Sequence, residues 1–131
     1  MTHKYIGTKE VVAWYQDKDG FPGYAVKYAD GYISWSPAKA FGEAYRRAEG
    51  PAQSLTFGDA LHYLKLGFTV ARSGWNGKGM WVAMQRPDEH SKMTLPYLYL
   101  CYPPDAANTP GARVPWLASQ TDMLAEDWRI M

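Results

Sequence analysis

Residues 56–67 read TFGDALHYLKLG, a stretch that predicts a short amphipathic helix. Thr56 is placed to cap the first turn. The Asp59 carboxylate can accept a hydrogen bond from the Thr56 amide and is also favoured at the positive end of the helix dipole. Gly67 supplies the left-handed residue at which such a helix ends. Apolar residues repeat at helical spacing along one face, namely Phe57, Ala60, Leu61 and Leu64.

Downstream of this helix, β-forming residues predict strands over 68–72, 80–86 and 96–102. Ser119 opens the cap-like sequence SQTD, which predicts one short helical turn. Residues 128–130 then close the chain as an extended piece. The second part is therefore predicted as a helix, three strands, a short helical turn and a terminal strand.

Upstream of the helix, residues 49–54 (EGPAQS) break the periodicity on both sides. We place a module boundary there, so that residues 1–50 form one module and residues 55–131 form another.

The first module is predicted to contain three strands followed by one helix. The strands are expected over 10–15, 23–28 and 32–35, with turns at 17–20 and 30–31. Ser36 is the expected N-cap, Pro37 the first helical residue, and the helix should reach about Arg47. Its apolar stripe comprises Ala40, Phe41, Ala44, Tyr45 and Ala48. The whole chain is thus predicted as α+β, with small antiparallel sheets each packed with one helix.

The composition excludes several classes of protein. A chain of 131 residues is one ordinary domain or two very small modules. With 14 basic and 13 acidic residues the net charge is +1, which speaks against partners that are nucleic acids or anionic membranes. No run approaches the about 18 apolar residues of a membrane span, and no signal peptide is evident, so we expect a cytoplasmic protein.

Aromatic content is high, because 6 Trp, 10 Tyr and 4 Phe make up 15% of the chain. Such rings either fill a core or line surfaces that a ligand or another subunit covers. The single cysteine, Cys101, cannot form an internal disulfide, and its apolar neighbours favour a buried, inert thiol.

The sequence predicts neither a metal site nor a cofactor. His3, His62 and His90 are isolated, and Cys101 has no partner at a recognised ligand spacing. No nucleophile-elbow sequence is present either.

Acid–base catalysis would have to use Asp122, Glu126 or Asp127. A structural interpretation is favoured, in which Asp122 caps a turn and the other two carboxylates form a solvated corner.

Residues 72–81 (RSGWNGKGMW) are the most informative stretch for chemistry. Their glycines permit close approach to a ligand, Trp75 offers a flat face for a base, and Asn76 is both donor and acceptor. Arg72 and Lys78 supply positive charge, although the pattern is neither a P-loop nor a dinucleotide fingerprint. Two interpretations stay open: a nucleotide pocket, or a glycine-rich hairpin loop with Trp75 folded onto the core.

Residues 115–128 (PWLASQTDMLAEDW) form a second candidate region. Short polar side chains open a helical turn whose exposed amides favour an anion. The structural alternative is a capping box over an apolar turn, with Leu124 and Trp128 in the core.

Four motifs together resemble a family of small phage and prophage proteins, the second type of Thoeris anti-defence protein. The resemblance spans about residues 55–131. The motifs are FGDAL at 57–61, GWNGKGMW at 74–81, LPYLY at 95–99 and ASQTDMLAEDW at 118–128.

This resemblance implies a non-enzymatic sponge that uses no cofactor. The resemblance also implies a homo-oligomer, typically a tetramer, that holds glycocyclic ADP-ribose signals made by TIR-domain defence proteins. Some members also take up the cyclic oligonucleotide signals of the CBASS defence system, cyclic dinucleotides among them, in separate pockets. By the same resemblance Trp75 would stack on adenine and Asn76 would hydrogen-bond the base or ribose. The other motif positions implied for the ligand site are Lys78, Ser119, Gln120 and Asp122.

Residues 1–50 depart from the compact members of this family. They resemble a separate small module of phage proteins, with the signature GYISWSP at 31–37 and no activity that we can assign. Two alternatives to a sponge stay open. One is an enzyme that degrades the same nucleotide with Asp122 or Glu126 as base, and the other is a protein-interaction or assembly module.

Overall fold

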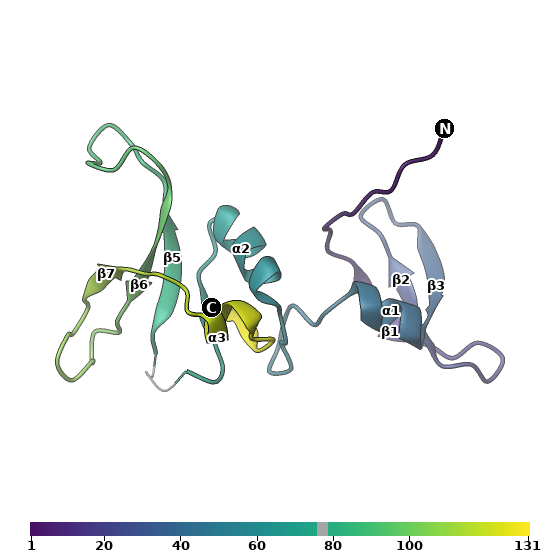
Figure 1. The fold of residues 1–131 in the computed structure, drawn as a ribbon. Helices are drawn as coiled ribbons and strands as arrows, with labels where there is room; N and C mark the ends of the chain where they lie inside the picture. Colours follow the sequence, from purple (N-terminus) through teal and green to yellow (C-terminus); the bar gives the residue numbers. More distant parts are fainter. Residues whose placement is uncertain (76–78) are drawn as a thin grey trace. The chain divides into compact units, whose positions relative to one another are not determined.

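The computed structural model describes residues 1–75 and 79–131. The chain forms two compact units, Met1–Tyr45 and Arg46–Met131 (Figure 1). Each unit combines an antiparallel sheet with helix, which confirms the α+β class predicted from the sequence.

The first unit is a three-stranded antiparallel meander with one helix packed on it. The strand order is β1-β2-β3, and the three predicted strands are confirmed. Tyr24 of the central strand stacks on Phe41 of the helix, with ring centroids 4.2 Å apart, while Val26 is buried beside it. The elements are β1 (Val12–Tyr15), β2 (Gly23–Lys27), β3 (Ile33–Pro37) and α1 (Ala38–Ala44).

The hairpin between β1 and β2 turns at Asp19 and Gly20, whose φ angles are 52° and 85°. Lys18 and Phe21 exchange two backbone hydrogen bonds of 2.9 Å across this turn. Positive φ at both central residues is typical of the type I′ turn, which matches the twist of the flanking strands. The turn predicted at 17–20 is therefore confirmed.

Helix α1 begins later and ends earlier than the sequence predicted. Ser36 does not cap it, because Ser36 pairs with Tyr24 in the sheet and the strand runs on through Pro37. Pro37 itself holds the N-cap position, with an extended ψ of 147° and no side-chain cap. The helix then covers Ala38–Ala44 and stops short of Arg47, so the predicted bounds were wrong at both ends.

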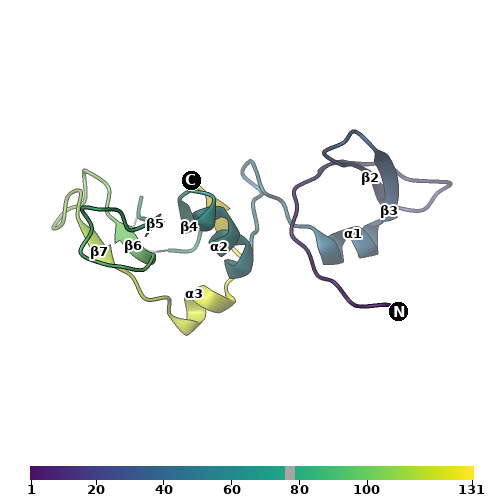
Figure 2. The ribbon, with the colours of Figure 1, turned by 90° about the horizontal axis from the view of Figure 1, so that it is seen from above.

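The second unit is a five-stranded antiparallel sheet in the order β7-β6-β5-β4-β8. Helix α2 packs along one side of this sheet, and the short helix α3 lies beside α2 (Figure 2). The elements are α2 (Phe57–Lys65), β4 (Val70–Arg72), β5 (Trp81–Gln85), β6 (Tyr97–Cys101), β7 (Arg113–Pro115), α3 (Gln120–Leu124) and β8 (Trp128–Ile130).

Helix α2 has the ends that the sequence predicted. The Asp59 amide donates to Thr56 Oγ1 over 3.2 Å, and the Thr56 amide donates to Asp59 Oδ2 over 3.0 Å, which completes the capping box. Gly67 follows the helix with a φ of 98°, the left-handed conformation that glycine adopts without strain. Because both ends are fixed locally, the helix presents a defined apolar face to the sheet.

The core of the second unit lies between α2 and the sheet. Trp128 is fully buried there and packs with Leu64, Val70 and Val82. Ala48, which the predicted stripe assigned to the first helix, packs instead on this core.

One strand of the second unit was missed from the sequence. The three predicted strands are confirmed as β4, β5 and β6, but β7 also pairs with β6, with Cys101 opposite Arg113 and Tyr99 opposite Pro115. A strand of three residues that ends in proline has almost no local signal, and its conformation depends on the neighbour it pairs with.

Cys101 is buried at the end of β6, as the sequence predicted, and burial raises the pKa of its thiol. Within residues 1–75 and 79–131, no helix combines the length and the apolar character that crossing a membrane requires.

Candidate ligand-binding site

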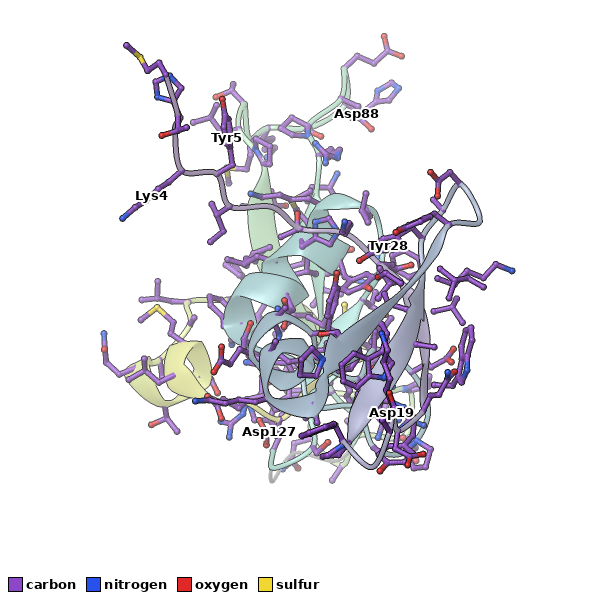
Figure 3. The ribbon with its side chains drawn as sticks, turned by 90° about the vertical axis from the view of Figure 1, so that its right-hand side faces the viewer. Lys4, Tyr5, Asp19, Tyr28, Asp88 and Asp127 are labelled. Carbon is purple, nitrogen blue, oxygen red and sulfur yellow. The ribbon has the colours of Figure 1, made fainter. Side chains whose placement is uncertain are left out.

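Pairing between β4 and β8 brings the two candidate regions of the sequence together. Arg72, the last residue of β4, lies opposite Trp128, the first residue of β8. The glycine-rich stretch therefore starts beside the segment that connects α3 to β8. The Ser73 amide continues the contact by donating to the carbonyl oxygen of Asp127 over 3.0 Å. Asp127 is labelled in Figure 3.

Arg72 joins two acidic side chains at this point. Its Nη1 donates to Asp122 Oδ1 over 2.9 Å, and its Nε donates to Asp127 Oδ1 over 2.8 Å. The side chains of Arg72 and Asp122 are only 15% and 14% exposed, so this ion pair is largely shielded from water. Arg72 thus carries no free positive charge for a ligand, although the sequence suggested it as a source of one.

Gly74 occupies a position that only glycine fits without rearrangement. Its amide donates to Asp127 Oδ2 over 2.9 Å. A Cβ atom at this residue would lie 2.7 Å from the same carboxylate oxygen. Glycine is therefore required at residue 74 because the Asp127 carboxylate lies too close to leave room for a side chain, and not because of an unusual φ angle.

Trp75 is half-buried and is held at several points. Its indole Nε1–H donates to Asp122 Oδ1 over 3.0 Å. Its ring makes edge contacts with Trp128 and Trp116, with centroids 5.4 Å and 6.2 Å away. Trp75 is therefore folded onto the core, as one of the two open interpretations predicted, while part of its surface stays accessible to a ligand.

Both aspartates of this cluster have pKa values below the ordinary value of the residue. Burial acts to raise the pKa of Asp122, but the hydrogen bonds from Trp75 and Arg72 outweigh it. The hydrogen bond from Arg72 is the largest influence on the pKa of Asp127 and lowers it. At neutral pH both groups are therefore carboxylates already occupied as acceptors, which is unfavourable for a general base.

The predicted turn after Ser119 is confirmed as α3, with some corrections to its side chains. Ser119 is the N-cap, and its Oγ accepts from the Asp122 amide over 3.1 Å. The Asp122 carboxylate binds Arg72 and Trp75, and hydrogen bonds from the hydroxyl and the amide of Ser119 also lower its pKa, so it contributes to the start of the turn as well. Asp127 is not a solvated corner, because it pairs with Arg72, and Leu124 is exposed rather than part of the core.

The structure brings part of the predicted ligand set together. Trp75, Asp122 and Ser119 meet in one hydrogen-bonded cluster, and Gln120 is exposed at the first position of α3. Asn76 and Lys78 lie outside the described residues.

Asp127 and Trp116 also belong to this cluster, and sequence reasoning assigned neither to it. Each is brought to Trp75 or Arg72 by long-range packing, which no local spacing reveals. In the described part of the chain, no three His, Cys, Asp or Glu side chains are grouped in a way that would hold a metal ion.

Comparison with known proteins identifies a family whose match lies within the second unit. The profile of a family described as Tad2-like, the Thoeris anti-defense 2-like domain, matches residues 55–131. The chain is also 38% identical over 84 residues to a protein named Thoeris anti-defense 2 from Bacillus phage SP01. That match covers 59% of this chain and 94% of the relative.

Proposed function

This chain belongs to the Thoeris anti-defense 2-like family and so has a phage anti-defence role, and we propose that it acts by sequestering a cyclic nucleotide signal. The signal that we propose is glycocyclic ADP-ribose, made by TIR-domain defence proteins. The protein binds it intact and withholds it from the host defence.

The immobilised indole of Trp75 is the observation that carries this proposal. One ring edge is held by Asp122, and Trp116 and Trp128 pack against the ring, so its orientation is set before a ligand arrives. A fixed aromatic surface loses little conformational entropy on binding and stacks well on a planar base. Sequestration requires this kind of preorganised contact, because it depends on slow release.

The charges of the site also favour sequestration over catalysis. Asp122 and Asp127 are both bonded to Arg72, and their pKa values are lowered. A general base works best with a pKa near the working pH and with a free lone pair directed at the substrate. Holding a nucleotide without cleavage makes no such demand.

We further propose that the protein acts as a homo-oligomer, with a tetramer favoured. Large apolar side chains are exposed to solvent around α3, where Leu117 is 92% and Leu124 is 78% exposed. Contact between subunits would remove these side chains from water. Light scattering on the purified chain measures this directly. A mass four times that of one 14.8 kDa chain supports the tetramer, and a single-chain mass contradicts assembly.

The test of the proposed function is calorimetric titration of the purified chain with glycocyclic ADP-ribose, followed by heat denaturation and chromatography of the released ligand. We expect saturable binding and recovery of intact ligand. Recovery of products would contradict sequestration and favour the nucleotide-degrading enzyme.

Two tryptophan variants locate the pocket. Trp75→Ala should abolish the binding heat, because it removes the stacking surface. Trp14→Ala is the matched control, since Trp14 is a partly exposed tryptophan of the first unit, and it should bind like the parent protein. Loss of binding in both variants, or in neither, would contradict the assignment to Trp75. If the parent protein takes up only cyclic dinucleotides, the proposed ligand is wrong.

A further inference from the structure

Arg72 connects three parts of the second unit through one side chain. It stands at the end of β4, while Asp122 lies within α3 and Asp127 lies just before β8. A third contact, from Nη2 to Asp127 Oδ2 over 3.4 Å, completes the fork. The guanidinium therefore fixes the end of β4 relative to both ends of the 122–127 segment.

Each of the two carboxylates also accepts a hydrogen bond from a residue at the start of the glycine-rich stretch. Asp122 Oδ1, which accepts from Arg72, also accepts the indole N–H of Trp75. Asp127 Oδ2 accepts the amide of Gly74. Consecutive residues of the stretch are thus held by acceptors that Arg72 itself holds in place.

The shape of the arginine side chain matters as well as its charge. Arg72 uses Nε, Nη1 and Nη2 together, and these donors lie in one plane at fixed angles. A lysine ammonium is a point charge on a flexible stem and cannot span two carboxylates in the same geometry. Without the guanidinium, two partly buried carboxylates would face each other with no cation between them.

We infer that Arg72 is a positioning residue of the ligand site. It does not touch the ligand, but acts through Asp122 and Asp127 to set the orientation of Trp75 and the path of the backbone at Gly74. The ligand-binding consequence of this inference rests on the proposed function, whereas the effect on Trp75 does not.

The first experiment measures Trp75 without any ligand. Nitrogen-15 labelling of the indoles gives one N–H signal for each tryptophan, and the signal that disappears in Trp75→Phe is that of Trp75. In Arg72→Lys, we expect this signal to shift and its exchange with solvent to become about tenfold faster, because Asp122 no longer stays in place as its acceptor. An unchanged signal and exchange rate would overturn the inference.

Two further variants separate positioning from general destabilisation. Asp122→Asn keeps the size of the side chain but removes its charge, and it should disturb the Trp75 signal in the same way. Arg46→Lys is the matched control, because Arg46 forms an ion pair with Asp59 in the same unit, at the start of α2. It should leave the Trp75 signal unchanged. An equal disturbance in the control would mean that any lost ion pair loosens Trp75, which contradicts a specific role.

The second experiment measures affinity for glycocyclic ADP-ribose in the parent protein, Arg72→Lys, Trp75→Phe and the double variant. We expect each single substitution to weaken binding about tenfold, and the double variant to be scarcely weaker than either, because both act through one indole orientation. Additive losses would overturn the inference. If the parent protein does not bind at all, the proposed ligand fails while the indole measurement still decides the role of Arg72.

Discussion

The two units of the chain bury their aromatic residues to different extents. In the second unit Trp128 is fully buried, and Trp75 and Trp116 pack around it. In the first unit no aromatic residue is fully buried: Tyr24 and Phe41 are half-buried, while Trp14 is 43% and Phe21 is 68% exposed. A high aromatic content therefore says nothing by itself about where the rings lie, and each unit has to be considered separately.

The difference follows from how much core each unit can build. In the first unit, Ala25 and Val26 are the buried hydrophobic residues, and both are small. A unit of about 45 residues buries too little apolar surface to be robust, so strand pairing and the stack of Tyr24 on Phe41 contribute a large share of its stability. The second unit has a larger buried core, and its candidate site lies against that core, because Trp75 packs on Trp128.

Trp128→Ala should produce the largest effect and tests this comparison directly. Removing a fully buried tryptophan leaves a cavity beside Leu64 and costs about 4 kcal/mol of unfolding free energy in the second unit. The amide NMR signals of each unit, followed against urea concentration, measure the two unfolding transitions separately. The transition of the first unit should not move.

Trp14→Ala is the control for size and residue type. Because Trp14 is partly exposed, its removal should change the stability of the first unit by about 0.5 kcal/mol. Equal losses in the two units would break the comparison, since both rings would then be core residues in energetic terms.

Gly23→Ala should be the most damaging single substitution that we predict for the first unit. A Cβ atom at residue 23 would meet the ring of Trp35 and would lie 2.5 Å from the carbonyl oxygen of Ser36, which is backbone and cannot move aside. We expect a loss of about 3 kcal/mol in the urea transition of the first unit.

Gly42→Ala is the matched control in the same unit. Gly42 lies in α1 with no atom within 4 Å of the added Cβ, so alanine should stabilise the helix by about 0.5 kcal/mol. A loss in this variant similar to that of Gly23→Ala would show that the first unit tolerates no change at all, and the steric argument would fail.

Acid should weaken the second unit by a smaller amount. Four of its aspartates have lowered pKa values in the folded protein. The stability that they contribute is therefore present above the ordinary pKa of aspartate and is lost as the pH falls through the lowered values. We expect the melting temperature of the second unit to fall between about pH 5 and pH 2. The four are Asp59, Asp88, Asp122 and Asp127, of which Asp88 is exposed and contributes least.

Asp127→Asn sharpens this test. The variant cannot lose a charge at residue 127, so its melting temperature should depend less steeply on pH than that of the parent protein. Identical pH profiles would show that the bond between Arg72 and Asp127 contributes nothing to stability.

Local signals predicted the elements whose determinants are local. The capping box at Thr56 and the glycine at 67 define α2 because each acts within one helical turn. The turn at Asp19 and Gly20 was predictable for the same reason. Such features need no knowledge of the rest of the fold.

The main errors and omissions involve long-range contacts. Ser36 and Pro37 have the chemistry of a helix start, but pairing of Ser36 with Tyr24 keeps them in the sheet. The cluster at the site joins Arg72 to acidic residues 50 and 55 positions later in the chain. A motif resemblance could direct attention to Trp75, but only the β4-β8 pairing shows what holds it.

The last prediction compares the starts of the two longer helices. Thr56→Ala removes a side chain that accepts from the Asp59 amide, and should cost the second unit about 1 kcal/mol. Ser36→Ala should cost the first unit much less, because Ser36 does not cap α1 and its hydroxyl donates only to the neighbouring carbonyl of Pro37. Both are measured as shifts in the urea midpoint of the unit concerned.

Comparing Ser36→Ala with Thr56→Ala decides whether capping by the Ser36 hydroxyl or pairing of Ser36 in the sheet determines where α1 begins. If Ser36→Ala costs as much as Thr56→Ala, the hydroxyl caps the helix in solution, and the start predicted from the sequence would be right after all. If it costs little, pairing with Tyr24 overrides a strong helix-start signal. Helix α1 then depends on the sheet and on the Tyr24–Phe41 stack, whereas α2 carries its own boundaries.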